Sequence, residues 1–183
     1  MRLFVGLPLA SEVLKELSGA VARLKHPHDG LRWTSPESWH ITLQFLGNTD
    51  RTHFDCVAPR LAEVHMAPVA VRLGRLGIFD RAGVFFADVV PTPELVELAR
   101  RVTVATARCG FVAEERPFHP HITLARAKGS GQSRTLRDLL DHVPQKAVFT
   151  GFTATEFLLY ESHTRPEGAQ YEVQARFPLA AEG

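Results

Sequence analysis

The stretch Phe118-His119-Pro120-His121-Ile122-Thr123-Leu124-Ala125-Arg126 decides how the chain folds, because part of it occurs twice. An earlier stretch, Trp39-His40-Ile41-Thr42-Leu43, carries the same His-Ile-Thr-Leu motif 81 positions before it. Isoleucine, threonine and leucine in alternation are typical of a β-strand, where residues two apart point to the same face. Each copy therefore places one imidazole and one hydroxyl on one strand face and two apolar side chains on the other.

The segments around the two motifs alternate between strand-like and helix-like patterns. Strands are expected over residues 2–7, 31–34, 39–46, 68–79, 83–90, 111–114, 120–126, 147–160 and 171–177. Three helices are expected to begin at the capping residues Ser11, Asp50 and Thr92, and a fourth is expected over 133–142. A loop over 128–131 and a disordered tail complete the assignment.

The repeat extends beyond the motif itself. The expected helix starts Ser11 and Thr92 also lie 81 positions apart, which predicts a duplicated unit of strand, helix, strand, helix and strand. Short connections between neighbouring strands favour antiparallel sheets. We therefore expect an α+β fold that forms one domain over residues 1–183, with two pseudo-symmetric lobes. The lobes would face each other across a central cleft, and each would contribute one His-x-Thr motif.

Composition is that of a globular protein, with 183 residues, 45% hydrophobic and 22% charged. A net charge of +1 argues against a broad basic surface for duplex nucleic acid, although a local basic site remains compatible with it. Cys56 and Cys109 are too few for a disulfide framework, so a reducing cytoplasm is expected. Pro8 interrupts the first apolar run, which favours a strand over a signal peptide, and no run is long enough to cross a membrane.

Two facing histidines can divide the work of acid and base catalysis. An imidazole gives and takes protons near neutral pH, so His40 and His121 can act on opposite sides of one substrate. Phosphodiester cleavage suits this arrangement, because it needs a deprotonated nucleophile and a protonated leaving oxygen. Thr42 and Thr123 can donate hydrogen bonds to the phosphate oxygens, and this chemistry needs no metal or other cofactor.

Several neighbours of the motifs have two interpretations. Gln44 and His119 share the strand parity of the histidines and are expected to line the cleft, although partly exposed strand-end positions are the alternative. His119 and His121 also resemble a metal-ligating pair, but no carboxylate or cysteine lies beside them at ligand spacing, so no metal site is expected. Tyr160 either stacks on a base or packs in the core.

Arg126 can neutralise phosphate charge, but its parity is that of Ile122 and Leu124, which face away from the cleft. It reaches the site only if the strand ends or bulges after Leu124. Phe45 has the parity of Ile41 and is therefore expected in the core.

With these residues in view, the sequence resembles the 2H phosphoesterases, specifically the RNA 2′,3′-cyclic phosphodiesterases of bacteria and archaea, also called 2′-5′ RNA ligases. The resemblance spans nearly the whole chain. Its segments are 1–7, 31–33, 40–43, 45–47, 116–118, 121–126, 159–162 and 171–173.

The resemblance implies a bilobal α+β fold and metal-independent hydrolysis of a terminal RNA 2′,3′-cyclic phosphate to a 2′-phosphate. It implies that His40 is the proton donor and His121 the proton acceptor. It places Thr42, Thr123 and Arg126 at phosphate-contacting positions. It also implies an RNA end or a related nucleotide as partner, with no membrane and no obligate protein partner, and we expect a monomer.

Two residues depart from the family's usual pattern: Gln44 stands where lysine is frequent, and His119 occupies a variable position. Two other kinds of 2H activity stay open, namely sealing or cleavage of 2′-5′ linked RNA and hydrolysis of a small cyclic nucleotide. From another class, a non-catalytic module that binds RNA ends or nucleotides is the alternative. Binding without turnover would favour that module.

Overall fold

The computed structural model describes residues 1–27, 29–128, 133–143, 149–165 and 168–180. Residues 129–131 of the expected loop, the start of the strand expected over 147–160 and the end of the tail lie outside this part. The helices are α1 (Ser11–Leu24), α2 (Arg51–Ala62), α3 (Pro93–Ala107) and α4 (Ser133–Asp141), with a 3₁₀ turn over Pro36–Ser38. The strands are β1 (Arg2–Pro8), β2 (Leu31–Trp33), β3 (His40–Asn48), β4 (Val69–Val71), β5 (Leu73–Phe79), β6 (Val84–Val89), β7 (His121–Ala127), β8 (Phe152–Ala154), β9 (Glu156–Arg165) and β10 (Gly168–Pro178).

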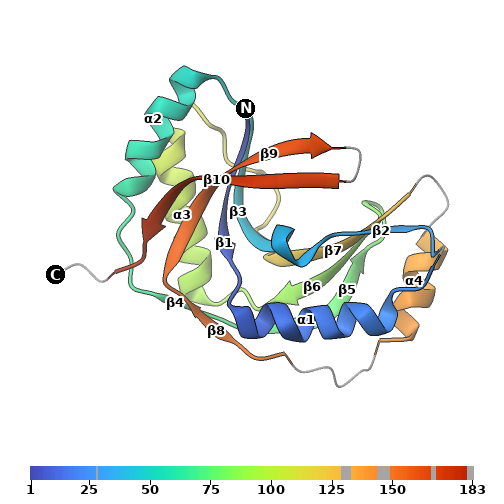
Figure 1. The fold of residues 1–183 in the computed structure, drawn as a ribbon. Helices are drawn as coiled ribbons and strands as arrows, with labels where there is room; N and C mark the ends of the chain where they lie inside the picture. The colour runs from blue at the N-terminus through green and yellow to red at the C-terminus, as the bar shows by residue number, and fades with distance from the viewer. Residues whose placement is uncertain (28, 129–132, 144–148, 166–167, 181–183) are drawn as a thin grey trace.

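The strands form two four-stranded sheets and one small pair (Figure 1). The first sheet has the order β10-β9-β1-β3, the second has the order β2-β7-β6-β5, and β4 pairs with β8. Every pairing is antiparallel. The α+β fold expected from the sequence is therefore confirmed, and each four-stranded sheet contains one His-x-Thr strand.

The sheets do not follow the two halves of the chain. β1 pairs with β3 on one side and with β9, from the end of the chain, on the other. β2, from the first half, pairs with β7 from the second half. The β1–β3 and β6–β7 pairs are equivalent to each other, but the strands that flank them come from distant segments. Sequence order alone therefore does not decide which strands share a sheet.

Helix capping agrees with the sequence at two of three positions. The side chain of Asp50 accepts a hydrogen bond from the backbone N–H of His53, and that of Thr92 accepts one from the backbone N–H of Leu95. The prediction for α1 was wrong, because Ala10 occupies the capping position and has no oxygen to offer. The strand expected over 111–114 was also wrong, because Val112 is 85% exposed there and the segment joins no sheet.

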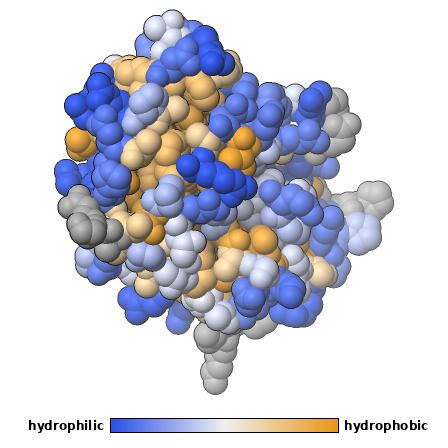
Figure 2. Space-filling model, turned by 60° about the vertical axis from the view of Figure 1, so that its left-hand side comes forward, coloured by the Kyte–Doolittle hydropathy of each residue, from blue (hydrophilic) through white to orange (hydrophobic). Residues whose placement is uncertain are grey.

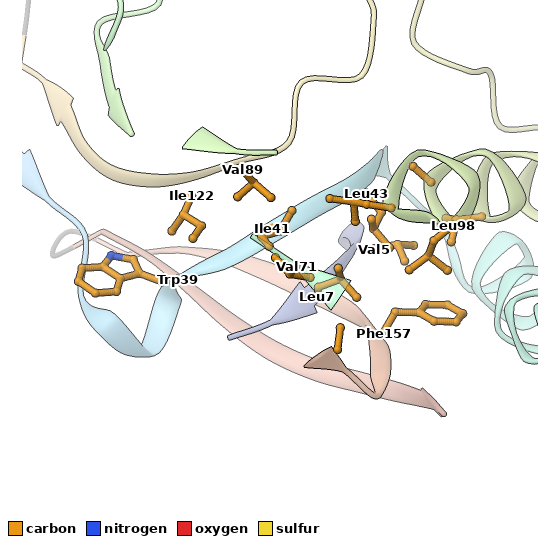
Figure 3. Packing of buried hydrophobic residues seen from close by; sticks show 14 of the residues in the cluster. Val5, Leu7, Trp39, Ile41, Leu43, Val71, Val89, Leu98, Ile122 and Phe157 are labelled. Atoms are coloured by element: carbon orange, nitrogen blue, oxygen red, sulfur yellow. The ribbon is translucent and has the colours of Figure 1, made fainter. Parts of the chain in front are cut away.

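One large hydrophobic cluster lies between the sheets and the helices (Figure 3). Ile41 and Leu43 enter it from β3, and Ile122 and Leu124 enter it from β7. Figure 3 shows Ile41 and Ile122 in the same group of side chains as Val89. Burial of four side chains of this size stabilises the motif strands by roughly 1.5–3 kcal/mol each. The apolar face of each motif is therefore the anchor that the alternating pattern predicted.

Cys56 and Cys109 form a disulfide that joins α2 to the end of α3. This pair was not expected from the sequence, because two cysteines are too few for a disulfide framework; the two residues lie 53 positions apart. The bond follows from packing, since α2 and α3 contact each other and bring both cysteines together.

Few large apolar side chains remain exposed on the described surface: Met1, Phe45, Val96, Val104, Val112 and Val173. On the face shown in Figure 2, hydrophobic residues gather in a strip with hydrophilic residues on both sides. None of the helices in the described part of the chain has the length and apolar character needed to span a bilayer.

Candidate active site

The two motif strands lie against each other, so both histidines belong to one region. β3 and β7 are in contact. A hydrogen-bonded bridge also joins them: the indole N–H of Trp39 donates to Thr34 Oγ1 at 2.8 Å, and that hydroxyl donates to the carbonyl of Leu124 at 2.8 Å. Trp39 immediately precedes His40, and Leu124 lies three residues after His121. The bridge therefore fixes one motif relative to the other.

Both imidazoles are held in the same way. Nδ1 of His40 lies 2.8 Å from the carbonyl oxygen of Ser38, and Nδ1 of His121 lies 2.8 Å from that of His119. Because a carbonyl can only accept, Nδ1 carries the proton in each neutral ring, and Nε2 is the nitrogen left for proton exchange. In His40 this nitrogen lies 3.1 Å from the Thr42 hydroxyl, which donates to it in the neutral state. The arrangement suits two groups that exchange protons through Nε2.

A β-bulge occurs at the same place in each motif. Pairing passes from Val5–Gln44 to Gly6–Thr42 and omits Leu43, and it passes from Phe85–Ala125 to Phe86–Thr123 and omits Leu124. A bulge inserts one residue and therefore reverses the facing of the residues that follow it. This change decides where the next side chains of both strands point.

The bulge brings Arg126 to the histidine side of β7, which is the condition set by the sequence analysis. Ala125 is fully buried and Arg126 is exposed. Burial is the largest cause that lowers the pKa of His40 and of His121, and the positive charge of Arg126 lowers both further, so the guanidinium acts on the two rings together. We define the paired-histidine site as His40, Thr42, His121, Thr123 and Arg126.

The same bulge in β3 overturns two expectations. Gln44 was expected to line the cleft, but it is 5% exposed and its Oε1 accepts a hydrogen bond from Thr106 Oγ1 of α3. Phe45 was expected in the core, but it is 57% exposed. Both expectations assumed that alternation continues unbroken past Leu43, and the extra residue of the bulge exchanges the two side chains.

His40 lies among aromatic rings. Its ring centroid is 4.5 Å from Phe4, 5.0 Å from Tyr171 and 5.7 Å from Tyr160. Burial lowers the pKa of His40 to about 4, the bond to the Ser38 carbonyl opposes this, and the charges of His121 and Arg126 lower it further. His40 is therefore neutral at neutral pH in the free protein.

Tyr160 packs in this cluster and is not an open stacking surface. It is 8% exposed and stacks on Phe4 with ring centroids 4.8 Å apart. Burial raises the pKa of its hydroxyl to about 12. The core alternative for Tyr160 is therefore confirmed, and the residue supports His40 from behind.

His121 lies in a more open and more polar setting. Its ring meets Phe79 edge-on at 4.9 Å, and the neighbouring His119 ring lies 6.2 Å away. Nε2 of His119 lies 3.0 Å from Asp88 Oδ1. Burial lowers the pKa of His121, its bond to a backbone carbonyl opposes this, the charges of His119 and Arg126 lower it, and the charge of Asp88 raises it. His119 therefore does lie beside the site, next to His121.

Sequence reasoning missed Phe4, Tyr171 and Asp88. Asp88 gave a usable signal, because it is the one charged residue in the apolar strand β6, directly opposite His121 in register. Phe4 and Tyr171 lie in segments that carry the family resemblance, but local patterns gave them no role, since they approach His40 through the pairing of β1, β9 and β10. Such pairing of distant strands is not visible in local patterns.

A cavity of about 800 Å³ lies elsewhere, and α1 and α4 contribute much of its wall. Neither motif histidine lines it. Among the described residues, no three His, Cys, Asp or Glu side chains gather as a group that could hold a metal ion. We place the candidate chemistry at the paired-histidine site, where the charge of Arg126 acts on both imidazoles.

Known proteins resemble the chain in both sequence and structure. The RNA 2′,3′-cyclic phosphodiesterase of Geobacillus stearothermophilus is 33% identical over 181 residues, which cover 96% of this chain and 56% of that relative. That of Thermotoga maritima is 30% identical over 179 residues, covering 94% of this chain and 92% of the relative. The crystal structure of E. coli LigT complexed with 3′-AMP has a TM-score of 0.81 and 26% identity, and the match covers 97% of each chain.

The family model described as LigT-like phosphoesterase matches residues 7–86 and 88–171. These ranges contain both His-x-Thr strands, both bulges and the aromatic residues Tyr160 and Tyr171. Since the match takes in most of the sequence and most of the site, the chain belongs to the LigT-like phosphoesterase family.

Proposed function

We propose that the protein hydrolyses the 2′,3′-cyclic phosphate at the end of an RNA to a 2′-phosphate, without a metal ion. The observation that carries the proposal is the matched pair of imidazoles, each with Nδ1 bonded to a backbone carbonyl and Nε2 left for proton exchange. Relatives that are RNA 2′,3′-cyclic phosphodiesterases support this substrate. The LigT complex with 3′-AMP supports a nucleotide as the bound group.

In the proposed reaction, water attacks phosphorus while Nε2 of His121 takes one of its protons. The bond between phosphorus and the 3′ oxygen breaks, and His40 gives a proton to that oxygen. The products are a 2′-phosphate and a 3′ hydroxyl, so atoms and charge balance. Thr42, Thr123 and Arg126 stabilise the charge that develops on the non-bridging oxygens.

Donor and acceptor differ in their surroundings. His40, the proposed donor, is neutral in the free protein because burial lowers its pKa to about 4. The bound phosphate must therefore restore its proton, since a nearby negative charge favours imidazolium. His121, the proposed acceptor, is more open to water and keeps a lowered pKa, as a base that must be neutral requires.

We also propose that residues 1–183 act as one catalytic domain of two pseudo-symmetric lobes, as a monomer in the cytoplasm. The equivalent β1–β3 and β6–β7 pairs support the two lobes. The proposed RNA substrate supports a cytoplasmic location. Because that compartment keeps most thiols reduced, the Cys56–Cys109 bond would be open in part of the population there.

The direct test is incubation with a short RNA that ends in a 2′,3′-cyclic phosphate, in excess chelator. Chromatography against 2′- and 3′-phosphate standards identifies the product. We expect a 2′-phosphate, and we expect His40→Ala and His121→Ala to lose activity while keeping the fold. A 3′-phosphate product would mean that the other bond breaks. Tight binding without turnover would identify a binding module, and restoration of chelated enzyme by one divalent ion would refute metal independence.

A further inference from the structure

We infer that Arg32 and Arg126 form a second phosphate site, which receives the phosphodiester one nucleotide before the reacting end. This inference rests on the proposed function and gives it a preference for RNA ends over single nucleotides. Its basis is a pair of like charges that the fold places face to face.

Arg32 and Arg126 are directly opposite each other in the β2–β7 ladder. Residues opposite each other in an antiparallel pair point to the same face of the sheet and lie close together. The neighbours on both strands confirm which face this is. Leu31 is 5% exposed and Ala125 is fully buried, whereas both arginines are exposed. The two guanidinium groups therefore share the face that carries the paired-histidine site.

Like charges directly opposite each other destabilise a sheet unless something compensates them. None of the ion pairs found among the described residues includes Arg32 or Arg126. Some exposed arginines in the described chain have carboxylate partners, for example Arg51 with Asp55 and Arg176 with Glu156, and others such as Arg75 are also without one. Arg32 and Arg126 differ from these because they lie directly opposite each other. An anion between the two guanidinium groups would supply the missing compensation, and their planar forks suit phosphate oxygens.

Arg32 lies where a second phosphate would bind beside the reacting one, and Arg126 lies between the two positions. The charge of Arg126 acts on both histidines, so this residue belongs to the first phosphate as well. Arg32 lies one strand further, about 4.8 Å away in the sheet, and on the side of β7 opposite to β6. The pair therefore continues the positive charge away from the histidines in one direction, which a nucleotide chain can follow.

The backbone of Arg32 is well fixed. Trp33 next to it donates from its indole N–H to Asp29 Oδ2 at 2.7 Å and meets Phe85 edge-on at 5.9 Å. The backbone N–H of Thr34 donates to the carbonyl of Leu124 at 2.9 Å. A change confined to the exposed side chain of Arg32 should therefore leave the fold intact.

The test compares three substrates: a nucleoside 2′,3′-cyclic phosphate, the same nucleotide with a 5′-phosphate, and a dinucleotide that ends in the cyclic phosphate. We expect wild type to prefer the dinucleotide, and Arg32→Ala to lower the dinucleotide-to-mononucleotide ratio of kcat/KM about tenfold. Arg32→Lys should restore part of it, because lysine keeps the charge without the fork. The control Arg51→Ala, an exposed arginine on α2, should leave the ratio unchanged.

An equal fall of kcat/KM on all three substrates, or no change in the ratio, would overturn the second site. If the 5′-phosphorylated mononucleotide behaves like the dinucleotide, the site binds any phosphate at that position. If it does not, the site requires the internal diester. Should wild type hydrolyse none of them, the proposed function fails. The site is then still decided by calorimetry, because Arg32→Ala must reduce the affinity for a dinucleotide 2′-phosphate more than for a nucleoside 2′-phosphate.

Discussion

Binding of a phosphate at the paired-histidine site should draw a proton into the protein. Burial holds the pKa of His40 at about 4 in the free state, so at neutral pH roughly one molecule in a thousand carries the charged ring. A proton donor must be charged when the 3′ oxygen departs. We therefore predict an uptake of about half a proton for each phosphate bound near pH 7, which rises towards one proton at lower pH, where the bound ring is charged and the free ring is still neutral.

The size of the effect can be worked out from the site. Each pKa unit corresponds to about 1.4 kcal/mol, so raising the pKa of His40 from about 4 to near neutrality needs about 4 kcal/mol. One negative charge at about 4 Å from the imidazolium supplies about 4 kcal/mol at an effective dielectric constant of about 20. A single phosphate charge is therefore enough to turn His40 into an acid, without movement of the rings around it.

Isothermal titration calorimetry in two buffers of different ionisation enthalpy measures this uptake. The ligand is a nucleoside methyl phosphodiester, whose single charge does not itself titrate near neutral pH. His40→Gln should abolish the uptake, whereas His121→Gln should keep most of it. Uptake that disappears in His121→Gln and persists in His40→Gln would reverse donor and acceptor. Absence of uptake in wild type, with normal affinity, would refute a donor role for either neutral ring.

Three further outcomes are expected. In a steady-state assay, His40→Ala should lower kcat/KM ~10²–10⁴-fold on the RNA cyclic phosphate but far less on a nitrophenyl phosphodiester, whose leaving group needs little protonation. His121→Ala should lower kcat/KM by similar factors on both substrates. If His121→Ala is instead the variant that keeps its activity on the nitrophenyl ester, the proton donor and acceptor are reversed. Gly6→Ala would place a Cβ 2.9 Å from the Ile41 carbonyl oxygen and 3.4 Å from His40 Cδ2, so urea unfolding should show a loss of about 1–3 kcal/mol together with lower kcat. Its control is Gly19→Ala, where the nearest atom, Nη1 of the flexible Arg23 side chain, is 3.7 Å away; an equal loss there would contradict the steric reason. The double change Cys56→Ser and Cys109→Ser should lower the free energy of unfolding by up to about 4 kcal/mol, from the closure of a loop of 53 residues, and equal urea midpoints with and without reductant in wild type would contradict this.

The local chemistry of the site was largely predictable from the sequence. The repeated motif predicted the burial of Ile41 and Ile122 behind the two histidines, because strand alternation is a local property. The capping roles of Asp50 and Thr92 were predictable for the same reason. Each of these features depends on residues within a few positions of one another.

The failures arise where distant segments set the geometry. Gln44 and Phe45 were exchanged because a bulge depends on the partner strand, here β1, and leaves no mark in the motif itself. The role of Arg126 depended on the matching bulge opposite β6, which the sequence analysis named as a condition but did not predict. The Cys56–Cys109 bond likewise depends on the packing of α2 against α3.

The place of β9 and β10 in the first sheet has a consequence for the order in which the molecule is made. A ribosome releases β1 and β3 early, but the other neighbour of β1 is β9, which is released only after both motif strands. Until then β1 is an open sheet edge, and His40 lacks the rings of Tyr160 and Tyr171. A nascent or truncated chain can therefore hold both His-x-Thr motifs and still lack the environment that tunes His40. The surroundings of His40 are complete only when β9 has paired with β1 and β10 with β9.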